Sequence, residues 1–153
     1  MKIMIVGCGR VGWRLAQRLE RVGHEIIVVD EDRETFSRLG GDFRGATFHG
    51  SGLDSFTLKR AGASGIDIVV AVTGGDNRNL MIAQLAKHLF GVQRVIARIK
   101  DPIRAAKYRD LGIETLCVTT VVEGLFELWV QNGTYPELPG EMSACGDASE
   151  LND

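Results

Sequence analysis

The chain has 153 residues, a length that fits one ordinary domain. Charged residues make up 25% and the formal net charge is -2, which excludes a disordered profile and a basic nucleic-acid footprint, so we predict no nucleic-acid partner. The apolar runs are far shorter than the roughly 20 residues of a membrane span, and the first residues lack a signal-peptide pattern. We therefore expect a cytoplasmic protein.

Strand-like apolar segments alternate with segments of helical periodicity along the chain, which is typical of parallel strands with crossover helices. The ranges 3–6, 26–29, 46–49, 67–72, 94–99 and 114–118 are the expected strands. The ranges 11–22, 32–39, 53–61 and 76–90, a segment from Pro102 onward and 121–132 are the expected helices. The fold class predicted for residues 1–133 is α/β, a Rossmann-type doubly wound parallel sheet of about six strands with helices on both faces.

Two further expectations concern the course of the chain. The apolar, mostly β-branched run at 67–72 predicts a central strand, buried on both faces. Asp76 is expected to cap the helix that follows it, and Thr119 or Thr120 the last one. Residues 134–153 contain acidic residues and no Lys or Arg, which indicates an acidic, mobile tail.

Cysteine and histidine residues show no metal-ligand spacing, so we predict no metal site. Cys8 and Cys117 are interpreted as small buried hydrophobic residues.

The strongest motif is Gly7-Cys8-Gly9-Arg10-Val11-Gly12, because it directly follows a strand and opens a helix. Gly7 permits a tight turn, Gly9 lets the backbone approach a pyrophosphate, and Gly12 allows close helix–strand packing. Free amides at the start of the helix favour phosphate binding there.

Asp30 ends the second strand, where a carboxylate accepts hydrogen bonds from the hydroxyls of an adenine-linked ribose and repels a 2′-phosphate. The alternative is a surface acid at a strand end. Asp32 binds ligand or caps the helix after it, and nearby Arg33 is the residue that would instead favour a 2′-phosphate. Arg10 either reaches a terminal phosphate or is simply solvated.

Residues that follow the later strands lie at the same edge of the predicted sheet. Thr73, Gly74 and Gly75 follow the central strand, and Arg98 and Lys100 close the fifth. Asn77 and Asn79 either contact ligand or satisfy amides at the helix start, and we favour the second role. The candidate cofactor-binding residues are Gly7, Gly9, Arg10, Val11, Gly12, Asp30, Glu31, Asp32, Arg33, Gly50, Ser51, Thr73, Gly74, Asn77 and Arg98.

Several separated motifs together resemble the regulator-of-potassium-conductance (RCK) domain, also called the TrkA amino-terminal (TrkA-N) domain, over about residues 1–132. They are Gly7 to Gly12 with Arg10 and Val11, Val28-Val29-Asp30-Glu31-Asp32, Gly50-Ser51-Gly52 with Leu58 and Ala61-Gly62, Asp67 to Thr73 with Asp76 and Asn79-Leu80, Ala86-Lys87 with Phe90-Gly91-Val92, Ile96-Ala97-Arg98, and Leu111-Gly112-Ile113. The family commonly has Gly-Asp-Ala or Gly-Asp-Gly where this chain has Gly50-Ser51-Gly52, so an aspartate is missing at the adenine end.

The resemblance implies a ligand-sensing domain of potassium channels or transporters that binds NAD(H) or ATP/ADP and assembles as dimers or rings. An NAD-dependent oxidoreductase is the alternative, because the fold alone hosts both roles. Against it, neither tyrosine has a lysine four residues later. A third reading, an assembly adaptor, predicts no nucleotide affinity. The resemblance also implies a carboxyl-terminal lobe, so we expect this sequence to be either a minimal version of the family or a fragment.

The last predicted helix, 121–132, is apolar over most of its circumference. Because one apolar stripe suffices for a domain's own core, the second indicates an association surface, and we predict a homodimer or larger ring through this helix. The alternative is that a further lobe, or the tail after Tyr135, covers it.

Overall fold

The computed structural model describes residues 1–110 and 112–134, with the side chain of residue 110 left out. The chain divides into two compact units, Met1–Thr119 and Thr120–Asp153. Of the predicted acidic tail, residues 135–153 lie outside the described part. No helix of the described residues is long and apolar enough to cross a bilayer.

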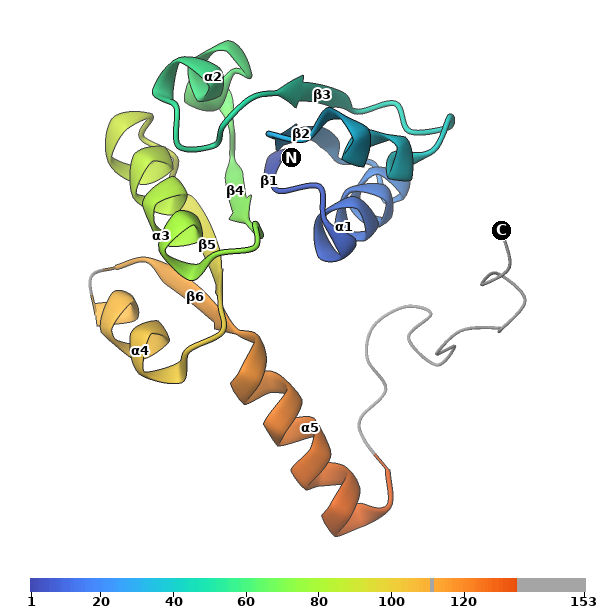
Figure 1. The fold of residues 1–153 in the computed structure, drawn as a ribbon, viewed down its shortest axis with the longest axis vertical. Coiled ribbons are helices and arrows are strands. Elements are labelled where there is room, and N and C mark those ends of the chain that lie inside the picture. The colour runs from blue at the N-terminus through green and yellow to red at the C-terminus, as the bar shows by residue number, and fades with distance from the viewer. Residues whose placement is uncertain (111, 135–153) are drawn as a thin grey trace. The chain divides into compact units, whose positions relative to one another are not determined.

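The first unit is built on a parallel sheet, whose described residues form six strands in the order β3-β2-β1-β4-β5-β6 (Figure 1). The strands are β1 (Lys2–Val6), β2 (Glu25–Asp30), β3 (Ala46–His49), β4 (Ile68–Ala71), β5 (Arg94–Ile99) and β6 (Glu114–Cys117). The predicted central strand is β4, which pairs with β1 and β5. The strand order reverses between β1 and β4, which makes their carboxyl ends the expected ligand crevice of a doubly wound sheet.

The helices lie between the strands along the chain, as crossover connections require (Figure 1). Those between strands are α1 (Arg10–Arg21), α2 (Ser55–Arg60), α3 (Asp76–Gln84) and α4 (Pro102–Asp110), with 3-10 helices at Arg33–Leu39 and Ala63–Gly65, and α5 (Val118–Asn132) follows β6. Pro102 opens α4, as predicted, because its fixed φ suits the first turn.

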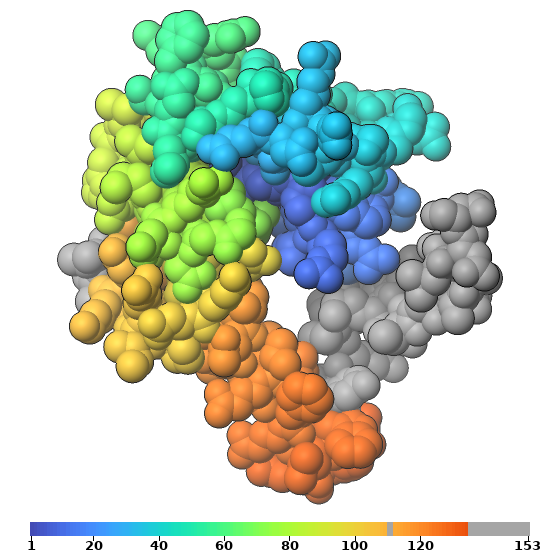
Figure 2. Space-filling view, in the orientation of Figure 1, coloured from blue at the N-terminus to red at the C-terminus, as the bar shows by residue number. Residues whose placement is uncertain are grey.

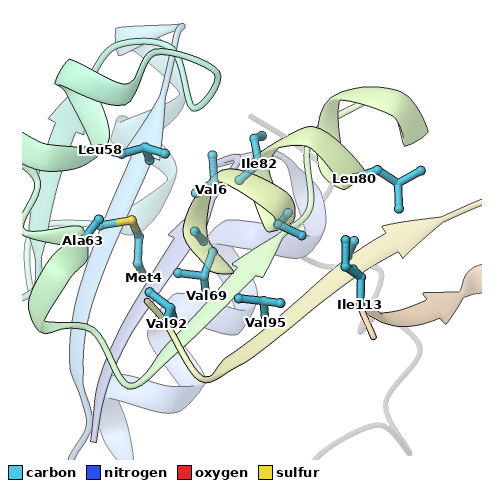
Figure 3. Packing of buried hydrophobic residues seen from close by; sticks show 14 of the residues in the cluster. Met4, Val6, Leu58, Ala63, Val69, Leu80, Ile82, Val92, Val95 and Ile113 are labelled. Carbon is cyan, nitrogen blue, oxygen red and sulfur yellow. The ribbon is translucent and has the colours of Figure 1, made fainter. Parts of the chain in front are cut away.

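The sheet of the first unit carries a hydrophobic cluster on each face. Side chains of β1 alternate, so Met4 and Val6 pack into one cluster and Ile3 and Ile5 into the other. The first cluster includes residues of α2, α3 and α4, and Figure 3 shows Val6 of β1 near Ile82 of α3. The second includes residues of α1 and the 3-10 helix. Helices therefore cover both faces, and the Rossmann-type fold class is confirmed.

The cysteine prediction is confirmed for the two cysteines that the structure describes. Cys8 and Cys117 are both buried. Burial raises the pKa of the Cys8 thiol, which favours the neutral, unreactive form.

Two sequence expectations about helix caps are wrong, and one helix changes its type along its length. Asp76 does not cap α3, because Gly75 takes the cap position and Asp76 accepts hydrogen bonds from the amides of Lys100 and Asp101. The expected helix to residue 90 continues as a π turn at Leu85–Leu89, with Phe90 at its cap position, so its end is as predicted. α5 begins at Val118, so Thr119 lies inside it, and the Thr119 hydroxyl donates to the Lys100 carbonyl.

Candidate functional site

A hollow of about 570 Å³ opens at the carboxyl edge of the sheet, where the glycine turn after β1 faces the ends of β2 and β4. Its volume falls within the roughly 300–1,000 Å³ of small-molecule sites. The lining residues are Val6, Gly7, Gly9, Arg10, Val11, Val29, Asp30, Glu31, Asp32, Thr35, Gly52, Val72, Thr73, Gly74, Arg78 and Arg98.

The glycines of the turn have different physical roles. Gly7 has φ +110°, and a Cβ there would lie 2.9 Å from the Thr73 nitrogen. A Cβ on Gly12 would lie 1.7 Å from the Gly7 carbonyl oxygen, so these two glycines let the turn, α1 and β4 pack together. A Cβ on Gly9 would meet nothing within 4 Å. Gly9 therefore borders open space, where a ligand can approach the backbone.

The start of α1 supplies free hydrogen-bond donors to this space. Gly9 occupies the cap position, and no side chain accepts a hydrogen bond there. The first amides of a helix have no intrahelical partner and carry the positive end of the helix dipole. The arrangement therefore suits a phosphate group.

Asp30 holds the glycine turn to the end of β2. Its Oδ2 accepts a hydrogen bond from the Cys8 amide at 2.5 Å, and its Oδ1 accepts one from the Asp32 amide at 2.8 Å. A carboxylate oxygen has room for more than one donor, so both oxygens can still accept the hydroxyls of a ribose. Asp30 thus makes a structural contact and also has acceptor capacity at the lining of the hollow.

The carboxylate of Glu31, the residue after Asp30, has a contact at each of its two oxygens. The Ser51 hydroxyl donates to Glu31 Oε1 at 2.6 Å, and Arg78 NH1 lies 2.9 Å from Glu31 Oε2. The Ser51 hydrogen bond, and after it the Arg78 charge, lower the pKa of Glu31. The segment after β2 and the start of α3 therefore meet at the surface, as the blue and green atoms in Figure 2 show.

A buried amide holds the β4 edge of the hollow. Asn79, 1% exposed, accepts hydrogen bonds from the Thr73 amide and hydroxyl and donates to the carbonyls of Thr73 and Arg98. Arg98 NH2 also donates to the Thr73 carbonyl at 2.6 Å. Asn79 therefore fixes the loop after β4, the start of α3 and the end of β5 relative to one another.

A second, shallower hollow of about 470 Å³ adjoins the first. Both hollows include Gly74 and Arg78, and the second is also lined by Asn77, Lys100 and Arg104. Asn77 accepts a hydrogen bond from Arg104 NH1 there, so its side chain serves a contact to α4.

Most of the candidate residues line the first hollow. Gly12 is buried behind the turn, exposed Arg33 does not line the hollow, and neither do Gly50 and Ser51. Asn77 lies in the second hollow.

Sequence reasoning missed part of the lining. The missed residues are Val6, Val29, Thr35, Gly52, Val72 and Arg78. Arg78 alone carried a usable signal, a cation in the first turn of the helix after the central strand, at the expected ligand edge.

The chain was compared with protein families and with curated proteins. Residues 3–119 match the TrkA-N domain. The chain is 48% identical over 116 residues to the Trk system potassium uptake protein TrkA of Streptomyces coelicolor, covering 76% of this chain and 52% of that protein. It is 30% identical over 114 residues to a TrkA homolog of Methanothermobacter thermautotrophicus, covering 74% and 52%. The chain thus spans about half the length of these relatives.

Solved structures share the fold at low sequence identity. The Shewanella denitrificans Kef CTD in AMP bound form has a TM-score of 0.69 at 24% identity, covering 86% of this chain and 82% of that one. GsuK bound to ADP has a TM-score of 0.72 at 20% identity, covering 86% and 34%. GsuK channel bound to NAD has a TM-score of 0.68 at 21% identity, covering 82% and 22%.

Proposed function

Because the chain belongs to the TrkA-N family, we propose that it binds an adenine nucleotide, NAD(H) or ATP/ADP, and acts as a nucleotide-sensing domain in a potassium transport system. The observation that carries the proposal is the hollow of about 570 Å³ at the switch point of the sheet, with Gly9 open to it. Relatives named as potassium uptake proteins and neighbours described with AMP, ADP or NAD support it.

The residues of the hollow fit such a ligand from end to end. The pyrophosphate would lie on the amides at the start of α1, beside Gly9, and the ribose on Asp30. Arg10 and Arg98 line the hollow and would balance the phosphate charge. The negative charge at the ribose and the positive charge near the phosphates therefore match the two halves of the ligand.

The proposed role is regulatory and not catalytic. NAD(H) or ATP/ADP would act as the sensed ligand, and the domain would transmit its occupancy to a membrane channel or transporter subunit on the cytoplasmic side. We expect purified protein with NADH and small carbonyl compounds to show no steady NADH oxidation. Sustained turnover would favour the oxidoreductase alternative.

Assembly of two or more copies through α5 completes the proposal. Phe126 and Trp129 of α5 are exposed, and so are Val122 and Val130. Exposed aromatic clusters of this kind mark association surfaces. The occupant we propose is a second copy of the chain, in a homodimer or larger ring.

Calorimetric titration tests the ligand. ADP, ATP, NAD, NADH and NADPH are titrated separately into nucleotide-free protein, with Gly9→Val as the non-binding control. We expect saturable binding of at least one of the first four, and weaker binding of NADPH because Asp30 faces the 2′ position. The proposal would be overturned if none of the five nucleotides bound. Tighter binding of NADPH than of NADH would mean that Arg33, and not Asp30, dominates recognition of the ribose.

A further inference from the structure

The ion pair between Arg78 and Glu31 joins two parts of the chain across the edge of the hollow. Glu31 directly follows β2, whereas Arg78 lies in the first turn of α3. Both residues line the hollow, and both side chains are about half exposed, at 46% for Arg78 and 45% for Glu31. We call the three residues Ser51, Glu31 and Arg78 the base clasp, because Ser51 holds the other oxygen of Glu31.

The base clasp lies at the adenosine end of the proposed ligand and not at its phosphate end. Phosphates belong on the amides after the glycine turn, and the ribose belongs on Asp30. The base extends from the ribose away from the phosphates. Arg78 NH1 is 2.9 Å from the carboxylate of the residue that follows Asp30, which brings the guanidinium to the side of the ribose and base.

Ser51 supports this ion pair by holding the other carboxylate oxygen of Glu31. An aspartate at this position, as in the usual pattern of the family, would place a second negative charge beside Glu31 and compete for Arg78. The Ser51 hydroxyl instead donates to Glu31 at 2.6 Å and leaves the other carboxylate oxygen to the guanidinium. The serine and the arginine therefore act together on the same carboxylate.

We propose that the Arg78 guanidinium, held in place by Glu31, packs on the purine base of the bound nucleotide and supplies the contact at the base end of the site. The proposal rests on the proposed function. A planar guanidinium stacks on aromatic faces and attracts their π electrons, whereas a lysine ammonium has no planar face. In this proposal Arg78 touches the ligand, and Glu31 is a positioning residue that acts through Arg78.

If Arg78 contacts the base, the loss of nucleotide affinity in its variants should not depend on the number of phosphates in the nucleotide. AMP, ADP and NAD share the adenosine moiety, so Arg78→Ala is expected to weaken all three by a similar factor, about tenfold. Arg78→Lys retains the positive charge and is expected to weaken binding nearly as much as Arg78→Ala. A contact to phosphate would instead give a loss that grows from AMP to ADP.

The experiment is a set of calorimetric titrations of AMP, ADP and NAD into wild type, Arg78→Ala, Arg78→Lys, Glu31→Gln and the double variant Glu31→Gln/Arg78→Ala. Arg60→Ala is the matched control, because Arg60 is exposed on α2 and lines neither hollow. We expect Glu31→Gln to weaken binding in the wild-type background and to add nothing in the Arg78→Ala background. If the role of Glu31 were purely structural, Glu31→Gln would lower nucleotide affinity equally in the wild-type and the Arg78→Ala backgrounds.

The outcomes separate this inference from the proposed function. If wild type binds none of the nucleotides, the proposed function fails and this inference falls with it. If wild type binds while Arg78→Ala and Arg78→Lys retain its affinity, only the base contact is overturned. A loss of affinity that increases with the number of phosphates also overturns the base contact, because it would assign Arg78 to the phosphate end of the site. Thermal unfolding of each variant verifies that the protein titrated is folded.

Discussion

Gly9 and Gly12 belong to one turn, yet an added side chain meets different surroundings at each. At Gly9 the new Cβ has nothing within 4 Å, and the residue lines the hollow. At Gly12 the new Cβ would lie 1.7 Å from the Gly7 carbonyl oxygen, an overlap that only movement of the backbone relieves. One glycine therefore serves ligand access, and the other serves folding.

The pair gives a prediction that separates ligand binding from stability. Gly9→Val is expected to abolish nucleotide binding while leaving the melting temperature close to that of wild type, because the side chain fills the space of the phosphates. Gly12→Ala is expected to lower the free energy of unfolding by about 1–3 kcal/mol, the usual cost of overpacking. Calorimetry and chemical denaturation measure the two effects. Wild-type affinity in folded Gly9→Val would contradict the assignment of the site.

Glu31 gives a prediction about pH at the scale of a single hydrogen bond. The Ser51 hydroxyl is the largest cause that lowers the Glu31 pKa, so Ser51→Ala is expected to move that pKa up toward its ordinary value. A carboxyl whose pKa is lowered on folding stabilises the protein above its unfolded pKa, and this contribution is lost as the pH falls through the lower, folded pKa.

Ser51→Ala should therefore reduce the acid dependence of stability that Glu31 contributes, in the region at and below pH 4.5, the ordinary Glu value. Carboxyl NMR titration of Glu31 in both proteins measures the pKa directly. An unchanged Glu31 pKa in Ser51→Ala would show that Arg78 alone causes the shift.

At the scale of elements, the strands followed from sequence more faithfully than the helix ends. The range 46–49 coincides with β3, which lies between the turn residues Gly45 and Gly50, and 94–99 coincides with β5, whose buried residues alternate with less buried ones. The first residue of α3 followed from the sequence, but its cap did not. Asp76 has the side chain of a cap, but the amides of Lys100 and Asp101, on the neighbouring strand's loop, engage its carboxylate instead.

Asn79 connects the loop after β4, the start of α3 and the end of β5 by hydrogen bonds. We predict that replacing its side chain lowers the free energy of unfolding. Asn79→Ala would leave the part-buried Thr73 amide and Arg98 carbonyl without this partner, and a group that loses its hydrogen-bond partner away from water costs about 1–3 kcal/mol. We expect a loss of at least about 2 kcal/mol in the free energy of unfolding. Asn77→Ala, two residues earlier and exposed, is the matched control, with an expected change within about 0.5 kcal/mol. Equal effects in denaturant titrations would contradict this role.

At the scale of the whole molecule, the candidate site divides into a local part and a part that only the fold brings together. Gly7 to Gly12 and Asp30 were identified because they stand in one strand–turn–helix–strand segment, where spacing alone places them. Arg78 was missed although it is a cation at the expected ligand edge, because its partner, Glu31, is 47 positions away and no spacing rule links the two residues. Ser51 was identified through the family pattern, yet its contact with Glu31 emerged only from the fold.

The proposed oligomer depends on α5, whose sequence offers two apolar faces. Val121, Leu125 and Leu128 follow one another at spacings of four and three, and so do Val122, Phe126 and Trp129 on the adjacent face. Glu123 and Glu127 leave a narrow polar strip between turns of the helix. The proposal is that a second copy of the chain covers these faces, because a two-fold dimer pairs the same surface patch of both copies.

Replacing Phe126 and Trp129 together with serine is therefore predicted to shift the particle from the mass of a dimer or ring to that of a monomer. Light scattering at micromolar protein concentration measures the mass. Nucleotide affinity should stay within about twofold of wild type, because the glycine turn belongs to the other compact unit. Replacing Glu123 and Glu127 with serine changes the same number of residues on the polar strip and should leave the mass unchanged. A wild-type protein that already runs as a monomer would contradict association through α5.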